Sequence, residues 1–189
     1  RPLSALGAMA KVIDGFEPRE QQQEMAAAVA EAIARRSTLL CEAGTGTGKT
    51  LAYLMPALES GARIIISTGT RNLQDQLFGK DLPLVRSVLG QPVQVVLLKG
   101  RSNYLCLQRL QVTEGQGVTD PQLASELRKV RDWASSTRLG DMSELTGVPE
   151  DAPVQRMVTS TADNCLGQEC GFWDECHVVK ARRSALDAD

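Results

Sequence analysis

The chain has 189 residues, a formal net charge of −2 at pH 7, and a composition of 42% hydrophobic and 23% charged residues. This length suits one domain, or one domain with a small insert, and the composition excludes a wholly disordered chain. No apolar run approaches the length of a membrane span, and the first residues lack the apolar core of a secretory signal, so we expect a cytoplasmic protein with no membrane partner. The acidic balance argues against a basic protein that coats DNA, while a local nucleic-acid groove stays open.

The first part of the chain alternates between helical and extended patterns. Met25, Val29 and Ile33 follow the 3–4 spacing of one apolar helix face, which predicts a helix over residues 19–36. The other elements expected here are strands at 37–42, 63–67 and 93–98 and helices at 51–58 and 72–78. Strands separated by helices indicate βαβ units, so we expect an α/β fold with a parallel sheet.

The pattern changes after residue 99. Residues 120–134 predict a helix with Asp120 as its N-cap and Pro121 in its first turn. Residues 135–164 show no clean period, and residues 178–186 predict a last helix. The change marks a candidate boundary between two parts of the chain.

The strongest local signal is a Gly-rich run between an expected strand and an expected helix, Ala43-Gly44-Thr45-Gly46-Thr47-Gly48-Lys49-Thr50. Its glycines let successive backbone N–H groups curl round a phosphate, and the following helix adds the positive end of its dipole. Lys49 can reach the β- and γ-phosphates, and Thr50 can place its hydroxyl on Mg²⁺. We therefore predict that all eight residues bind ATP with Mg²⁺ and that Lys49 and Thr50 are catalytic.

Four of the five cysteines are placed like metal ligands: Cys106, and then Cys165, Cys170 and Cys176 close together. Without a secretory signal, a metal site is favoured over a disulfide framework. Four thiolates hold either a [4Fe–4S] cluster or Zn²⁺, and only one short pair of the kind found in zinc knuckles is present. Cys41, in an expected strand, is predicted to be a small buried hydrophobe.

Several segments share one resemblance. The form A-x-x-G-x-G-K-T, with Ala43 where the strict pattern has Gly, is similar to motif I of superfamily 2 helicases. The run from Lys99 to Cys106 looks like the segment that delivers the first cluster ligand in the iron–sulfur helicases related to XPD and DinG. The x4 and x5 spacings of the later cysteines resemble the bacterial DinG/YoaA branch of that family, and the resemblance covers residues 12–186.

The resemblance implies roles for particular residues. The segment from Phe16 to Gln22 is similar to one in which an Arg and a Gln, here Arg19 and Gln22, lie near the adenine of the nucleotide. The segment from Ile66 to Leu77 resembles motif Ia, which contacts the backbone of the translocated strand. The DNA contacts implied in this way are Thr68, Thr70, Arg71, Asn72 and Arg101. The cluster ligands implied are Cys106, Cys165, Cys170 and Cys176, with [4Fe–4S] as the cofactor.

The same resemblance implies an architecture and an activity. Residues 1–100 are expected to form part of a RecA-like motor domain 1, residues 101–180 an inserted and mostly helical iron–sulfur domain, and residues 181–189 the start of the return into the motor. The activity implied is ATP-dependent 5′-to-3′ movement along single-stranded or forked DNA, in DNA repair or replication, in a bacterial cytoplasm at the nucleoid. No D-E-A-H box is present, because Asp174–His177 has only its outline and no apolar strand before it. We therefore expect an N-terminal fragment that binds nucleotide and does not unwind DNA alone.

Two other classes remain open from the residues. One is a different P-loop enzyme, such as a kinase or a non-helicase ATPase, with a zinc site. The other is a non-enzymatic redox or DNA-damage sensor that uses an iron–sulfur cluster. His177 is expected to be solvated or hydrogen-bonded rather than a ligand, and Phe172 and Trp173 either shield the cluster or stack on DNA. A local basic set forms either a solvated helix face or a phosphate contact, and its members are Arg128, Lys129, Arg131 and Arg138.

Overall fold

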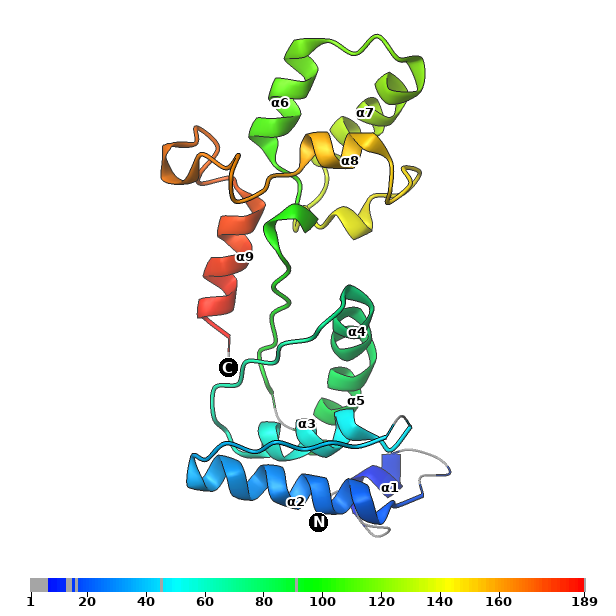
Figure 1. Ribbon diagram of the computed structural model, residues 1–189, viewed down its shortest axis with the longest axis vertical. Helices are drawn as coiled ribbons and strands as arrows, with labels where there is room; N and C mark the ends of the chain where they lie inside the picture. The colour runs from blue at the N-terminus through cyan, green and yellow to red at the C-terminus, as the bar shows by residue number, and fades with distance from the viewer. Residues whose placement is uncertain (1–6, 13–14, 16, 45, 91, 189) are drawn as a thin grey trace. The chain divides into compact units, whose positions relative to one another are not determined.

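A computed structural model describes residues 7–12, 15, 17–44, 46–90 and 92–188 (Figure 1). The described chain divides into two compact units, the first ending at Val95 and the second beginning at Val96. The expected domain boundary at residue 100 lies inside the second unit. Each unit has an apolar core of its own. Among the described residues, no helix is both long and apolar enough to cross a membrane.

The first unit is built from helices that cover one another. Its described elements are α1 (Ala8–Val12), α2 (Glu20–Arg35), α3 (Lys49–Glu59), α4 (Arg71–Gln76), a π-helical turn (Leu77–Asp81) and α5 (Leu82–Leu89). The expected helix over residues 19–36 is confirmed as α2, which packs against α3. Arg36 ends α2 in a left-handed conformation with φ +51°, and this turn reverses the chain toward the start of the helix.

The core of the first unit lies between α3 and α5. Leu54 and Met55 of α3 and Val85 of α5 are almost fully buried, and Met9 of α1 joins them. The helix expected at 72–78 is present but does not stop there, because α4, the π-helical turn and α5 follow one another without a break. Pro83 lies in the first turn of α5, where proline is tolerated because its missing N–H is not needed.

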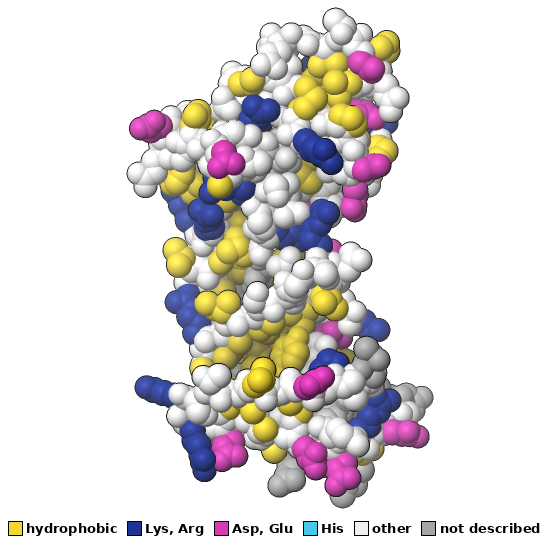
Figure 2. Space-filling model, in the orientation of Figure 1, with side chains coloured by type: hydrophobic (Ala, Val, Ile, Leu, Met, Phe, Trp, Pro, Cys, Tyr) yellow, Lys and Arg dark blue, Asp and Glu magenta, His cyan; other side chains and the backbone are white. Residues whose placement is uncertain are grey.

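The expected parallel sheet is not formed by the described residues. The three runs at 37–42, 63–67 and 93–98 contain no residue in a strand. Leu40 is 97% exposed and Ile65 is 94% exposed, although a strand of a parallel sheet is normally covered on both faces. Figure 2 shows apolar side chains on the surface of this unit. The apolar pattern thus identified residues suited to a buried strand. The strands and helices that would cover Leu40 and Ile65 are not among the described residues, so both side chains stay exposed.

The second unit is mostly helical. Its helices are α6 (Leu107–Gln116), α7 (Pro121–Ala134), α8 (Pro153–Val158) and α9 (His177–Leu186), with 3₁₀ turns at Arg101–Asn103, Met142–Glu144 and Gly167–Glu169. Two of the expected helices are confirmed as α7 and α9. The Asp120 side chain accepts a hydrogen bond from the Leu123 N–H at 2.8 Å, so it caps α7 as predicted. Residues 181–186, expected to begin a return into the motor, continue α9.

Short backbone pairings join three distant segments of the second unit. Tyr104 pairs with Asp141 and Leu105 with Thr159 in isolated antiparallel bridges. The Leu105 N–H also donates to the Gly140 carbonyl at 2.8 Å. Leu105 is buried in the core formed by α6, α7 and α8, so apolar packing and backbone hydrogen bonds fix the same short segment. This segment leads directly into Cys106.

Candidate nucleotide site and cysteine group

The Gly-rich run forms a loop that turns directly into α3. Gly46 and Gly48 have φ values of +76° and +80°, which residues with a Cβ rarely adopt. The Lys49 ammonium donates to the carbonyl oxygens of Ala43 at 2.7 Å and Gly44 at 2.6 Å. An ammonium has three N–H bonds, so these two contacts with described residues leave a further donor for a phosphate oxygen. Thr45 lies outside the described residues.

Arg19 and Gln22, expected near the adenine, contact the loop backbone. The Arg19 guanidinium donates to the Gly46 carbonyl. The Gln22 amide donates to the Gly48 carbonyl at 3.1 Å, and the Gln22 side chain is buried. A Cβ on Gly48 would clash with this amide, so the loop and the start of α2 are fitted closely together. The structure therefore brings both predicted residues to the phosphate loop, and no adenine contact has been tested.

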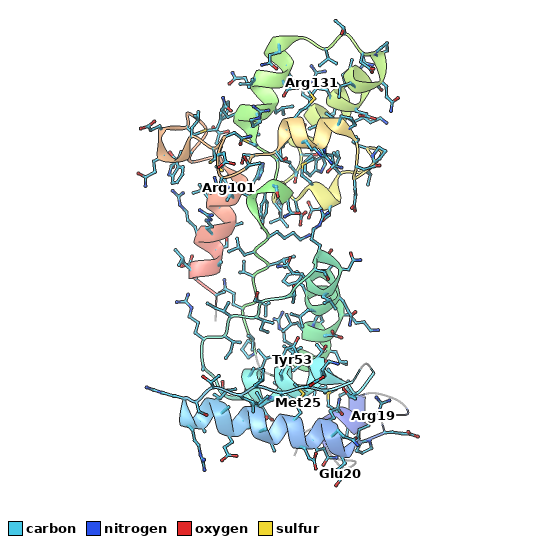
Figure 3. The ribbon with its side chains drawn as sticks, in the orientation of Figure 1. Arg19, Glu20, Met25, Tyr53, Arg101 and Arg131 are labelled. Atoms are coloured by element: carbon cyan, nitrogen blue, oxygen red, sulfur yellow. The ribbon has the colours of Figure 1, made fainter. Side chains whose placement is uncertain are left out.

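Thr50 lies in the first turn of α3 beside Tyr53. Burial raises the pKa of Tyr53, and a side-chain hydrogen bond with Thr50 acts in the opposite direction. Figure 3 shows Tyr53 of α3, Glu20 and Met25 of α2, and Arg19, the N-cap residue of α2. For the predicted Mg²⁺ role, the Thr50 hydroxyl must turn from Tyr53 toward the metal.

The segment that resembles motif Ia forms the start of α4. The Thr70 hydroxyl accepts from the Leu73 N–H at 3.3 Å, and the Thr68 hydroxyl donates to the Thr70 carbonyl at 3.2 Å. Arg71 and Asn72 are exposed on the first turn of this short helix. Thr70 caps the helix and Thr68 bonds to the backbone beside it, so local structure accounts for both hydroxyls and their contact with DNA stays a prediction. Arg101 lies in the second unit, in the 3₁₀ turn before Tyr104.

Cys106 sits where the paired segment meets α6. Burial raises the pKa of its thiol, the Arg109 N–H and the Ser160 hydroxyl act in the opposite direction by hydrogen bonding, and Cys176 and Cys170 raise it further by charge. Repulsion of this kind acts only between groups that lie near one another, so it indicates that Cys106 faces both later cysteines. A thiol of this kind is protonated at neutral pH without a metal and releases its proton on binding one.

The later cysteines differ in exposure. Cys170 and Cys176 are half-buried and Cys165 is exposed, and all are free of disulfides. Cys176 is the N-cap residue of α9, as Cys106 is of α6, so two helix N-termini begin at thiols. Within the described residues, no three His, Cys, Asp or Glu side chains are grouped closely enough to hold one metal ion. The structure thus brings Cys106 toward two of its predicted partners without closing a single-ion site.

His177, the first residue of α9, contacts the loop that precedes the 3₁₀ turn at Met142–Glu144. Its imidazole is buried and packs on Gly140 so closely that a Cβ there would clash, and its Nδ1 has no hydrogen-bond partner among the described residues. Burial thus excludes the solvated alternative of the expectation and lowers the pKa of His177, while hydrogen bonding to the Arg138 backbone acts in the opposite direction. Because Gly140 also accepts from the Leu105 N–H, the loop links the segments that carry Cys106 and Cys176.

One expectation about the cysteines is wrong. Cys41 was predicted to be a buried hydrophobe in a strand, but it is exposed. The reason is the one given for the sheet: the run at 37–42 has no strand partner among the described residues. It leaves Cys41 as an accessible thiol outside the group of predicted ligands.

The basic set lies mainly on α7. The Arg131 guanidinium lies 3.9 Å from the Glu114 carboxylate of α6, and the Lys129 ammonium donates to the Gly147 carbonyl at 2.7 Å. Arg131, labelled in Figure 3, lines a pocket of about 350 Å³ together with Arg128 and Glu114. Acidic and basic side chains are mixed on the face of this unit seen in Figure 2. Some of these basic side chains are thus engaged by contacts within the protein. Phosphate binding by the set stays a prediction.

The loop, its lysine and the helix that follows have the arrangement of a loop of the P-loop class. Residues 19–130 match a family model described as DEAD/DEAH box helicase, which covers more than half of the chain. The chain therefore belongs to the DEAD/DEAH box helicase family.

Curated relatives agree with this assignment. The chain is 52% identical over 184 residues to "ATP-dependent DNA helicase YoaA" of Haemophilus influenzae and 51% identical over 184 residues to the protein of the same name in Escherichia coli; each match covers 97% of this chain and 29% of the relative. It is 41% identical over 199 residues to "ATP-dependent helicase DinG" of Mycobacterium tuberculosis, covering 93% of this chain and 30% of that protein. The chain thus spans less than a third of the length of these relatives.

Proposed function

We propose that this chain is part of an ATP-dependent DNA helicase of the iron–sulfur type, which couples ATP hydrolysis to 5′-to-3′ movement along single-stranded or forked DNA in repair or replication. The first unit contributes the nucleotide-binding loop of a RecA-like motor domain, and the second is an iron–sulfur domain inserted in that motor. Family membership and the names of the YoaA and DinG relatives support this proposal. The proposed place of action is the bacterial cytoplasm, at the chromosome.

The observation that carries the proposal is the loop around Lys49. Its ammonium, the loop N–H groups and the positive end of α3 all favour a phosphate at this position. Thr50 can then place its hydroxyl on Mg²⁺, and Arg19 and Gln22 hold the loop from the start of α2. Hydrolysis also needs an acidic residue on the metal, and the sequence of this chain contains no D-E-A-H box to supply it.

The proposed cofactor of the second unit is a [4Fe–4S] cluster held by Cys106, Cys165, Cys170 and Cys176. The donor set fits, because iron–sulfur clusters are bound by four thiolates and Cys106 interacts electrostatically with two of the other three. A single Zn²⁺ with bonds of about 2.3 Å would need its four sulfurs within about 4 Å of one another, whereas a cluster spaces its ligands more widely. When bound, the cluster would cross-link the two ends of the unit and supply a one-electron redox centre.

The proposed DNA contacts come from both units. In the first unit they are the hydroxyls of Thr68 and Thr70 with Arg71 and Asn72 at the start of α4, and in the second unit Arg101. Hydroxyls, guanidinium groups and helix N-termini are common phosphate contacts, and they carry no sequence information. The proposed partner is therefore the backbone of single-stranded DNA, without sequence preference.

The motor proposal is tested with Lys49→Ala in the full-length protein. We expect DNA-stimulated ATP hydrolysis and unwinding of a 5′-tailed fork to fall by at least about 10²-fold, because a positive charge placed on the transferring phosphoryl group is lost. Lys80→Ala is the matched control, since Lys80 is an exposed lysine in the π-helical turn of the same unit. Full hydrolysis and unwinding by Lys49→Ala would overturn the motor proposal and favour the sensor class.

The cofactor proposal is tested by metal analysis and absorption of the same protein. We expect four irons per chain and a broad band near about 400 nm, lost in Cys106→Ser and Cys170→Ser. Cys41→Ser is the matched control, because Cys41 is an exposed cysteine of the first unit and is not one of the proposed ligands. A colourless protein that holds zinc would support the rival P-loop enzyme with a zinc site instead.

A further inference from the structure

Ser160 is a residue that sequence analysis did not single out, and it lies opposite the segment that carries the first proposed ligand. Leu105 pairs with Thr159 in an antiparallel bridge, and the Cys106 N–H donates to the Val158 carbonyl at 2.8 Å. In this register Cys106 and Ser160 are diagonal neighbours whose side chains share one face. The pairing therefore brings a hydroxyl to the Cys106 sulfur across 54 sequence positions (160 minus 106).

The Ser160 hydroxyl is withdrawn from solvent. Only 4% of the residue is exposed, and hydrogen bonding by its hydroxyl counters the rise that burial causes in the pKa of the Cys106 thiol. A hydroxyl buried without a partner costs free energy, so donation to the sulfur would satisfy Ser160 as well as Cys106. The neighbouring Thr161 is exposed, and its backbone N–H donates to the Asn164 side chain at 2.8 Å.

The direction of this hydrogen bond is fixed once the sulfur is ionised. A metal-bound cysteine is a thiolate, which accepts hydrogen bonds and has none to donate, whereas a serine hydroxyl can rotate to donate. Hydrogen bonds to the sulfur ligands of an iron–sulfur cluster offset negative charge. They stabilise the reduced cluster, which carries one electron more, relative to the oxidised one.

We propose that Ser160 is a positioning residue for the cluster: its hydroxyl donates to the sulfur of Cys106, orients that ligand and raises the reduction potential of the cluster. This inference rests on the proposed [4Fe–4S] site. It adds a residue outside the four cysteines that acts on the cofactor through one of its ligands.

The test uses the full-length protein with its cluster, as wild type, Ser160→Ala, Ser160→Thr and the control Thr161→Ala. Iron content, the visible band and the reduction potential, measured by an EPR-monitored titration, are recorded for each. We expect Ser160→Ala to shift the potential to a more negative value, Ser160→Thr to restore it because the hydroxyl returns, and Thr161→Ala to match the wild type.

Each other outcome has a defined meaning. A Ser160→Ala protein with four irons and an unchanged potential would overturn the role of Ser160 while leaving the cluster proposal intact. Wild-type protein without iron would overturn the cluster and the role of Ser160 with it. Ser160→Ala could also lose its iron. In that case, iron retained by Ser160→Thr supports a role for the hydroxyl in holding the cluster, and loss of iron in both variants overturns the proposed role of Ser160.

Discussion

The Lys99 ammonium lies 2.9 Å from the Asp141 carboxylate, with only 3% and 12% of the two side chains exposed. Asp141 also accepts from the N–H and hydroxyl of Ser143, at 3.0 and 2.8 Å, and the Lys99 N–H donates to the Tyr104 hydroxyl at 3.0 Å. The pair thus joins the entrance of the second unit to the turn that pairs with Tyr104. Two residues beyond Tyr104 lies Cys106, so this ion pair belongs to the framework that holds the first proposed ligand.

Removing one partner of the buried Lys99–Asp141 pair should lower the stability of the second unit. We expect Lys99→Ala to lower the free energy of unfolding of the second unit by about 3–5 kcal/mol, because Asp141 is left buried without its counter-charge. Urea denaturation measures the change, with Arg131→Ala as the control at an exposed ion pair, expected to cost no more than about 1 kcal/mol. The double variant Lys99→Met/Asp141→Leu should recover most of the loss. Equal effects of Lys99→Ala and Arg131→Ala would contradict a buried pair.

The same pair predicts how stability depends on pH. Burial alone would raise the pKa of Asp141, but hydrogen bonds from Lys99 and Ser143 outweigh it and hold the pKa below 3.8. Since the folded pKa lies below the unfolded one, the stabilisation is complete above the unfolded pKa and is lost as the pH falls through the folded value. We expect the difference in unfolding free energy between wild type and Asp141→Asn to be constant from pH 7 to about 5 and to shrink below about pH 4. A difference that keeps its size in acid would contradict this assignment.

Because His177 packs on Gly140, we expect a glycine-to-alanine change to cost more stability at Gly140 than at a glycine without such a neighbour. Gly140 and Gly147 both have positive φ, at +66° and +77°, but a Cβ clashes only at Gly140, where the imidazole lies. We expect Gly140→Ala to destabilise the unit by about 1–3 kcal/mol more than Gly147→Ala, since only the former adds overpacking to backbone strain. Thermal unfolding of the two variants measures the difference. Similar losses at both sites would mean that His177 moves aside without cost.

Gln22 can act at the nucleotide site in two ways, by holding the phosphate loop or by contacting adenine, and a variant distinguishes them. Its amide holds the Gly48 carbonyl, so Gln22→Ala should weaken binding of an ATP analogue by about fivefold, equivalent to one hydrogen bond of about 1 kcal/mol. Binding of matched ATP and GTP analogues to the full-length protein shows which role dominates. If Gln22 acts only through the loop, both affinities fall together, whereas a selective loss for ATP indicates that the amide reads adenine. Unchanged affinity for both would contradict either role.

Local patterns predicted the helices well and the extended segments poorly. The cap at Asp120 and the apolar period of residues 19–36 are local properties, and α7 and α2 follow them closely. The run around Ile65 has the composition of a buried strand, but a strand exists only when another pairs with it, and pairing is not encoded within the run. The helix α5 was not among the expected elements; it begins at Leu82, and Pro83 lies in its first turn, where a helix tolerates proline.

The sequence by itself determined the phosphate loop, its lysine and the four candidate thiolate ligands, because these depend on residue types at short and fixed spacings. Only the tertiary structure decided that Gln22 supports Gly48, that Cys41 is exposed and that Asp141 neutralises Lys99. It also placed Ser160 diagonally across from Cys106 through the backbone pairing of their segments. Such contacts join residues far apart along the chain, and they arise from the packing and backbone pairing of whole segments, which the spacing within any one segment does not specify.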